Sequence, residues 1–118
     1  MGRGAEKEET TNARILKRLT ATARAYVEAA AKEERASDRN AERRTKESAD
    51  EWRSALTLAN ARRRDVAKVL VCIAEDERIA AAAIRGADKV EKWREGGAKY
   101  ADDLLKRVGD EKKRRRKW

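Results

Sequence analysis

The sequence predicts an all-α protein built on a long antiparallel helical hairpin, followed by short C-terminal helices. Three observations predict this class. The 118 residues contain no Pro and only six Gly. Ala, Arg, Lys and Glu are abundant, and all four favour helices. Apolar residues recur three or four positions apart, which is the period of one face of an α-helix.

We expect the first helix to run from about Thr11 to Arg35. Its apolar residues form one narrow stripe, made of Ile15, Leu16, Leu19, Ala23, Tyr26, Val27 and Ala30. The polar, cap-forming residues between Ala36 and Asn40 predict a turn there, because Ser, Asp and Asn favour helix boundaries.

We expect the second helix to begin between Asn40 and Ala49, where Ser48 and Glu51 have the spacing of a capping box. Its apolar stripe consists of Trp52, Leu56, Ala59, Val66, Leu70 and Ile73. Cys72 lies in an apolar run, which indicates a small core residue.

A short third helix is expected from Asp76 to Gly86, with Ile79 and Ile84 facing inward. Apolar residues from Val90 to Val108 predict a last helix that is interrupted at Gly96 and Gly97. The sequence therefore predicts a single helical domain over residues 1–108. Residues 109–118 are expected to form a disordered basic tail.

A hairpin with narrow apolar stripes leaves one side open. Two hairpins packed together close that side as a four-helix bundle, so we expect a symmetric homodimer. The alternative is a monomeric bundle in which the last helix covers the hairpin.

The composition argues against an enzyme. The chain has no His and a single Cys, so a His-activated nucleophile, a His-containing zinc site and a Cys-pair metal site are excluded. We expect no cofactor, no metal and no small-molecule substrate. No apolar run approaches the roughly 20 residues of a membrane span. The polar, acidic first twelve residues do not resemble a signal peptide, so we expect a cytoplasmic protein.

The charge balance is strongly basic, with 31 Lys and Arg against 22 Asp and Glu and a formal net charge of +9. Residues 1–60 carry a net charge of +2 and residues 61–118 carry +7. Nucleic acid, an anionic membrane face and an acidic protein are the partner classes that such a surplus favours.

Each residue of an α-helix is rotated by 100° about the helix axis from the residue before it, and this rotation places basic residues of the second helix on one face. Arg39, Arg43, Lys46, Arg53, Thr57, Arg64 and Lys68 fall within a sector of about 80°, opposite the apolar stripe. On a continuous helix this sector spans about 44 Å. Only 4% of the residues are aromatic, which provides little stacking for single-stranded bases. The pattern therefore favours a binding face for the backbone of duplex RNA.

The segment from Arg78 to Gly86, Arg-Ile-Ala-Ala-Ala-Ala-Ile-Arg-Gly, resembles a stretch in the insect nodavirus suppressors of RNA silencing. The resemblance covers about Arg62 to Gly86. The family's Lys-Pro before the short helix is replaced here by Glu77-Arg78. The resemblance implies a homodimeric bundle that binds double-stranded RNA without sequence preference and suppresses silencing by sequestering it. It places RNA-contacting residues at Arg62, Arg63, Arg64 and Lys68, of which the helical rotation favours Arg64 and Lys68.

Two other interpretations stay open. One is a designed or structural helical bundle without a dedicated ligand. The other is a coiled-coil interaction module in which residues 112–117 serve as a nuclear-import signal or a general polyanion anchor. For Trp118, stacking on a base or on a partner and an ordinary chain end are both open.

Overall fold

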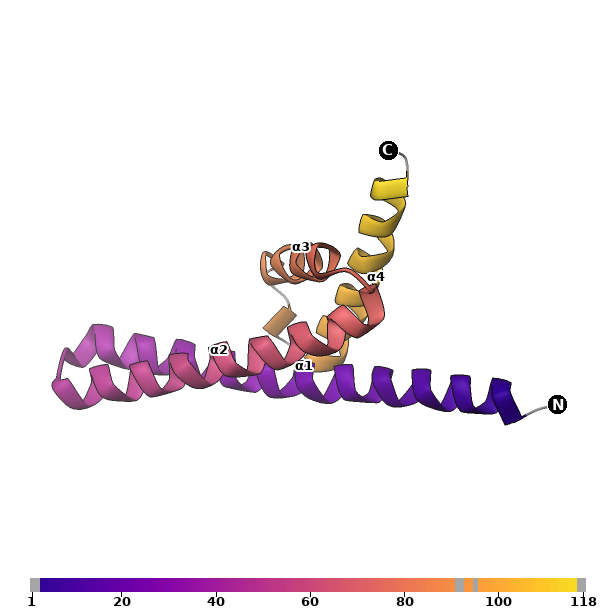
Figure 1. Ribbon diagram of the computed structural model, residues 1–118. Helices are drawn as coiled ribbons and strands as arrows, with labels where there is room; N and C mark the ends of the chain where they lie inside the picture. The colour runs from indigo at the N-terminus through magenta and orange to yellow at the C-terminus, as the bar shows by residue number, and fades with distance from the viewer. Residues whose placement is uncertain (1–2, 91–92, 95, 117–118) are drawn as a thin grey trace.

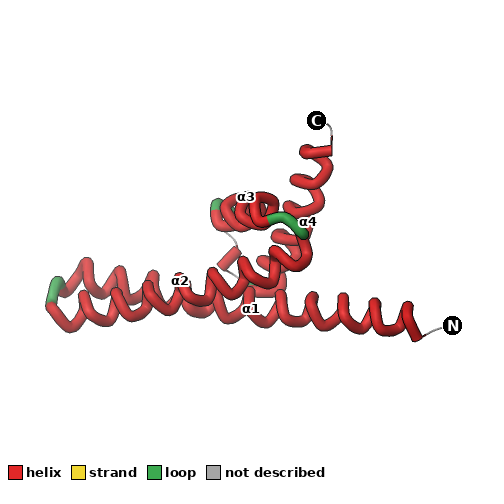
Figure 2. Tube along the Cα trace, viewed as in Figure 1, coloured by secondary structure: helices red, strands yellow, loops and turns green. Residues whose placement is uncertain are grey.

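The computed structural model describes residues 3–90, 93–94 and 96–116 and is all-helical, which confirms the predicted fold class. Its helices are α1 (Arg3–Arg43), α2 (Lys46–Ala74), α3 (Glu77–Asp88) and α4 (Gly97–Arg116). The described part of the chain contains no strand (Figure 2). Figure 1 shows α1 and α2 side by side as a long hairpin, with α3 and α4 packed at the end where α2 stops.

The first helix is longer than predicted, and the turn expected between Ala36 and Asn40 is absent. Both residues are helical, and Ala36 is buried between the helices of the hairpin. The polar residues of this segment are compatible with a helix: Asp38 is exposed, Ser37 is half-buried, and the half-buried Asn40 accepts from the Ser48 hydroxyl. The chain reverses only at Arg44 and Thr45, so α2 begins within the predicted range and continues without a break to Ala74.

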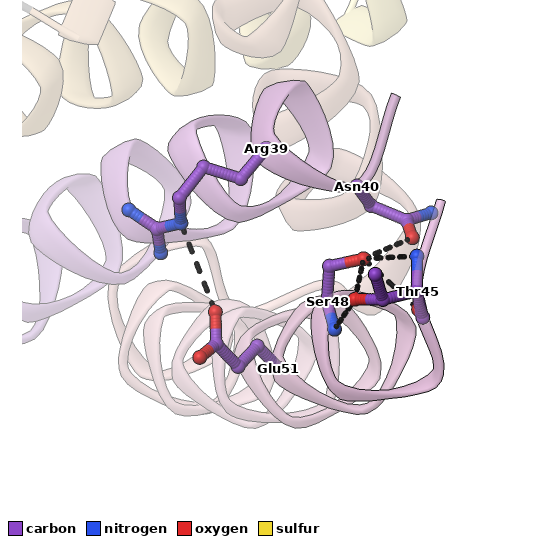
Figure 3. A network of polar contacts seen from close by, with 5 residues as sticks. All are labelled: Arg39, Asn40, Thr45, Ser48 and Glu51. Atoms are coloured by element: carbon purple, nitrogen blue, oxygen red, sulfur yellow. Dashed lines mark hydrogen bonds and ion pairs between the residues drawn. The ribbon is translucent and has the colours of Figure 1, made fainter. Parts of the chain in front are cut away.

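Side-chain hydrogen bonds fix the turn between α1 and α2 (Figure 3). The backbone N–H of Ser48 donates to the hydroxyl of Thr45, and the backbone N–H of Thr45 donates to the hydroxyl of Ser48, both at 3.1 Å. The Ser48 hydroxyl also donates to Oδ1 of Asn40 at 3.0 Å. The capping box therefore lies one turn earlier than the predicted Ser48–Glu51 box, and it ties the end of α1 to the start of α2.

The corner between α2 and α3 confirms Asp76 as the start of the third helix. Its side chain accepts from the backbone N–H of Arg78 at 2.7 Å and from that of Ile79 at 3.4 Å. Glu75 ends α2 in the left-handed conformation, with φ of 60°. Gly86 does not end α3, because its backbone stays helical and the helix continues to Asp88.

The core lies where all four helices meet. Its largest fully buried side chains are Tyr100, Leu19, Leu70, Leu104 and Val66. Tyr26 of α1 stacks on Trp93 with ring centroids 5.2 Å apart, and Tyr100 packs against both rings. The C-terminal part of the chain thus covers one face of the hairpin around Tyr26.

Helix α4 departs from the prediction at its C-terminal end. Residues 109–116 were expected to form a disordered tail, but they belong to α4, which continues to Arg116. The side chains of Glu111 and Lys112 are half-buried against the rest of the molecule, and Lys112 Nζ donates to the backbone oxygen of Ile73 at 3.5 Å. Residues 117 and 118, including Trp118, lie outside the described residues.

The crossing of α4 over α1 requires glycine at position 97. A Cβ atom there would overlap with the backbone of Arg24 and would lie 2.7 Å from its nitrogen. We expect Gly97→Ala to lower the free energy of unfolding by about 1–3 kcal/mol, because the two helices must separate to make room. Thermal and urea unfolding followed by circular dichroism measures this change.

Gly109→Ala is the matched control. Gly109 lies within the same helix, and a Cβ atom there meets nothing within 4 Å. Its replacement should raise the free energy of unfolding by up to about 1 kcal/mol, because Ala favours the helix. Equal stability of the two variants would contradict the close crossing.

Candidate nucleic-acid interface

Five of the predicted binding residues lie on the outer face of α2. They are exposed and belong to one uninterrupted helix: Lys46, Arg53, Thr57, Arg64 and Lys68. At 1.5 Å per residue, Lys46 and Lys68 are about 33 Å apart along the helix axis. This group is called the α2 basic face below. It is shorter than the predicted face because α2 starts at Lys46.

Arg39 and Arg43 do not belong to the α2 basic face, which corrects the prediction. Both lie on α1, where they line a surface hollow together with the acidic Glu47, Asp50 and Glu51 of α2. Arg39 Nε is 3.7 Å from Glu51 Oε2 (Figure 3). This part of the surface therefore carries mixed charge, which makes it a poor site for a polyanion.

The basic residues of α2 differ in how their charges are balanced. Arg53 is 3.6 Å from Asp50, and Arg62 is 3.6 Å from Asp65. Arg64 and Lys68 have no ion pair with a carboxylate among the described side chains. The Thr57 hydroxyl donates to the backbone oxygen of Arg53 at 2.9 Å. Lys46 has no such ion pair with a described carboxylate either, but it lies next to the acidic Glu47. Arg64 and Lys68 are thus the two unpaired charges at the end of this face away from the turn.

Arg62 is exposed but points away from the α2 basic face. Two residues of helix correspond to a rotation of about 200°, so Arg62 and Arg64 project from nearly opposite sides of α2. The four positions that the resemblance suggests therefore do not share one surface, and only Arg64 and Lys68 lie on the face that the helical rotation favours. The structure brings Arg64, Lys68, Thr57, Arg53 and Lys46 to one face and leaves Arg62 on another.

Arg63 faces inward and takes part in a polar network. Its Nε donates to Asp88 Oδ2 at 2.9 Å, and the hydroxyl of Tyr100 donates to Asp88 Oδ1 at 2.8 Å. Trp93 Nε1 donates to the backbone oxygen of Asp88 at 3.1 Å. Asp88 therefore connects α2, α3, α4 and the segment before α4. The sequence did not indicate this role for Asp88, because its partners Arg63 and Tyr100 lie 25 and 12 residues away along the chain.

A second hollow joins α1 to the end of the α2 basic face. It is lined by Ile15, Arg18, Lys68, Val69 and Cys72. Arg18 of α1 thus lies across the groove from Lys68 of α2, a position that the separate helix wheels do not reveal. Cys72 is exposed in this groove, which corrects its prediction as a core residue.

The C-terminal end of α4 is a further concentration of positive charge. Lys113, Arg114, Arg115 and Arg116 are exposed, and Arg114 is 3.5 Å from Glu111. The pKa of the Asp76 carboxyl is lowered, mainly because the backbone N–H of Arg78 donates to it, and the charge of Arg115 acts in the same direction. Basic side chains of α4 therefore reach the corner between α2 and α3.

No protein-family model matches the chain, and comparison with curated proteins and with solved structures gives no match. Within the described residues, no group of three or more His, Cys, Asp or Glu side chains is placed to hold a metal ion. No helix in that part of the chain is both long and apolar enough to cross a membrane.

Both tyrosines should resist ionisation in the folded protein. Burial raises the pKa of Tyr26 and of Tyr100, and the nearby negative charge of Asp88 raises both further. We expect little phenolate absorbance near pH 10 in the native state, whereas both side chains of the unfolded chain ionise there. Ultraviolet titration with and without guanidinium compares the two states.

The same shifts predict the direction of the pH dependence of stability. Because each folded-state pKa lies above the unfolded value, the stabilisation is complete below about pH 10 and is lost as the pH rises further. If the native protein instead shows half of the full absorbance change near pH 10, one of the two tyrosines is exposed. That result would contradict the network around Asp88.

Proposed function

We propose that the protein binds double-stranded RNA without sequence preference, using the α2 basic face. The observation that carries the proposal is the exposure of Lys46, Arg53, Thr57, Arg64 and Lys68 along one side of a continuous helix. Such a helix holds its charges at fixed spacing, as a regular double-stranded backbone does. The narrow major groove of an A-form duplex keeps side chains from the bases, so contacts go to phosphates and 2′-hydroxyls.

The placement of the aromatic residues supports a duplex rather than a single strand. Proteins that bind single strands stack bases on exposed aromatic rings. Tyr26, Trp93 and Tyr100 are buried in the core, and the half-buried Trp52 donates from Nε1 to Glu33 at 2.8 Å. Every aromatic side chain that the structure describes is therefore engaged within the protein.

In this proposal the protein acts by sequestration rather than by catalysis. A duplex held along α2 is shielded from enzymes that must surround it. The resemblance to the nodavirus suppressors connects this shielding with suppression of RNA silencing in the host cytoplasm. The proposal involves neither a cofactor nor a membrane, because phosphate contacts and the release of counterions supply the binding free energy.

The first test of the proposal removes the two unpaired charges at the end of the α2 basic face away from the turn. We expect Arg64→Ala/Lys68→Ala to weaken binding to an RNA duplex of about 20 base pairs by roughly tenfold or more. The slope of log affinity against log salt should become shallower by about two, since two phosphate contacts are lost. Gel shifts at several salt concentrations measure both quantities, with single-stranded RNA and B-DNA as competitors.

Lys32→Ala/Arg35→Ala is the matched control, because it removes two exposed charges from the mixed-charge part of α1. It should bind RNA as the unmodified protein does. A third variant replaces Lys113, Arg114 and Arg116 by Gln and leaves Lys112 and Arg115 at the α2–α3 corner. If this variant alone abolishes binding while Arg64→Ala/Lys68→Ala does not, the α4 end is a general polyanion anchor and the α2 basic face is rejected.

We further propose that two copies of the chain associate through the turn end of the hairpin. Away from the core, α1 and α2 contact only each other, and Leu58 is exposed by 42%. A second hairpin that packs on this side of α2 would cover Leu58 and complete a four-helix bundle. The arrangement would place two α2 basic faces in one particle.

Leu58→Glu tests this association. The substitution places a charge in the proposed contact and should convert the dimer into a monomer without unfolding it, because Leu58 is already exposed in the single chain. Sedimentation equilibrium across a concentration series measures the change. A monomeric unmodified protein at every concentration would contradict the dimer and would leave RNA binding by a single α2 face as the remaining proposal.

A further inference from the structure

The positive charge of the chain is confined to particular segments. Residues 10–27 contain four basic and no acidic residues, and residues 52–74 contain five basic residues and one acidic residue. Residues 28–51, around the turn, contain six basic and eight acidic residues, a net charge of −2. The hairpin therefore has a neutral to acidic turn end, and its surplus lies at the other end.

The antiparallel packing of the hairpin brings the two basic segments together. The hollow lined by Ile15, Arg18, Lys68, Val69 and Cys72 shows that the first half of α1 lies against the second half of α2. Figure 1 shows the same pairing, with α1 continuing past the point where α2 gives way to α3. Arg14 lies one helical turn before Arg18, and its side chain is exposed like that of Arg18.

These arginines carry charge that is not compensated by the described side chains. Arg14 and Arg18 form no ion pair with them, as is true of Arg64 and Lys68. At the turn end, by contrast, Arg39 is 3.7 Å from Glu51. Like charges brought together without counter-charges cost stability in a free protein. Such a cluster is typical of a surface that meets a polyanion.

We propose that the phosphate-binding surface is shared by α1 and α2, with Arg18 contacting the same duplex as Lys68 from across the groove. Arg14 extends this surface by one turn of α1. The inference rests on the proposed function and relocates its centre, from the length of α2 to the end of the hairpin away from the turn. Basic side chains from two neighbouring helices can bind phosphates of both strands that border one groove of the RNA duplex.

Much of this groove is apolar, so we expect the charged side chains of Arg18 and Lys68 to make the contacts with the phosphates. The other lining residues are Ile15, Val69 and Cys72, and none of their side chains is a strong hydrogen-bond donor to a phosphate. The long arginine and lysine stems can lie along this apolar surface and present their charged groups to the ligand. A single strand would need aromatic side chains on which its bases stack, and no aromatic side chain lines this groove.

The test uses the full chain and an RNA duplex of about 20 base pairs, in the gel shifts described above. Arg18→Ala should weaken binding several-fold and make the salt slope shallower by about one. Arg35→Ala, which removes an exposed arginine from the turn end of the same helix, should leave both quantities unchanged. Arg18→Lys keeps the charge and should restore most of the affinity, which a purely structural role of the guanidinium would not predict.

The outcomes separate this inference from the proposed function. If Arg18→Ala and Arg35→Ala bind equally while Arg64→Ala/Lys68→Ala loses binding, α2 acts alone and the shared surface is wrong. If Arg64→Ala/Lys68→Ala also binds RNA as the unmodified protein does, both proposals fail. Circular dichroism of each variant establishes that the helices are intact, so a loss of affinity reports on the contact itself.

Discussion

The register between α1 and α2 determines which charged residues meet, and it is fixed at the turn. The reciprocal hydrogen bonds of Thr45 and Ser48, with the bond from Ser48 to Asn40, allow the chain to reverse at Arg44 and Thr45. From this point the helices run antiparallel, so a position early in α1 lies beside a position late in α2. A reversal between residues 36 and 40 would change every pair along the hairpin, and Arg18 would no longer lie opposite Lys68.

Neighbouring arginines of α2 have different roles because a helix turns by 100° per residue. Arg63 is half-buried on the core side of α2 and donates to Asp88, which also accepts from Tyr100. This network attaches α3 and α4 to the hairpin, and it holds the rings of Tyr26, Trp93 and Tyr100 against one another. Arg64 points outward and carries no such bond. The folded core therefore uses one member of the basic run and leaves the next available to a ligand.

Periodicity was sufficient to predict the helices but not their limits. The apolar stripe around Leu19 and Tyr26 correctly indicated a buried face, and the third helix was correctly expected to start at Asp76, its N-cap. The turn was misplaced because Ser, Asp and Asn also occur within helices, where Asn40 accepts a hydrogen bond from Ser48 of the next helix. This error assigned Arg39 and Arg43 to the wrong helix. Arg18, Asp88 and the ordered end of α4 depend on contacts between distant segments, which no single helix wheel contains.

The cluster of basic residues at one end of the hairpin links stability to binding. Repulsion among Arg14, Arg18, Arg64 and Lys68 acts over short distances, because salt at physiological strength screens charges beyond about 8 Å. These side chains are exposed, so water and counterions reduce the cost in the free protein. In the proposed complex, the phosphates of a duplex would replace the counterions at fixed positions and would remove the repulsion. The ligand should therefore stabilise the packing of α1 against α2, and it should do so most at the end of the hairpin where the charges lie.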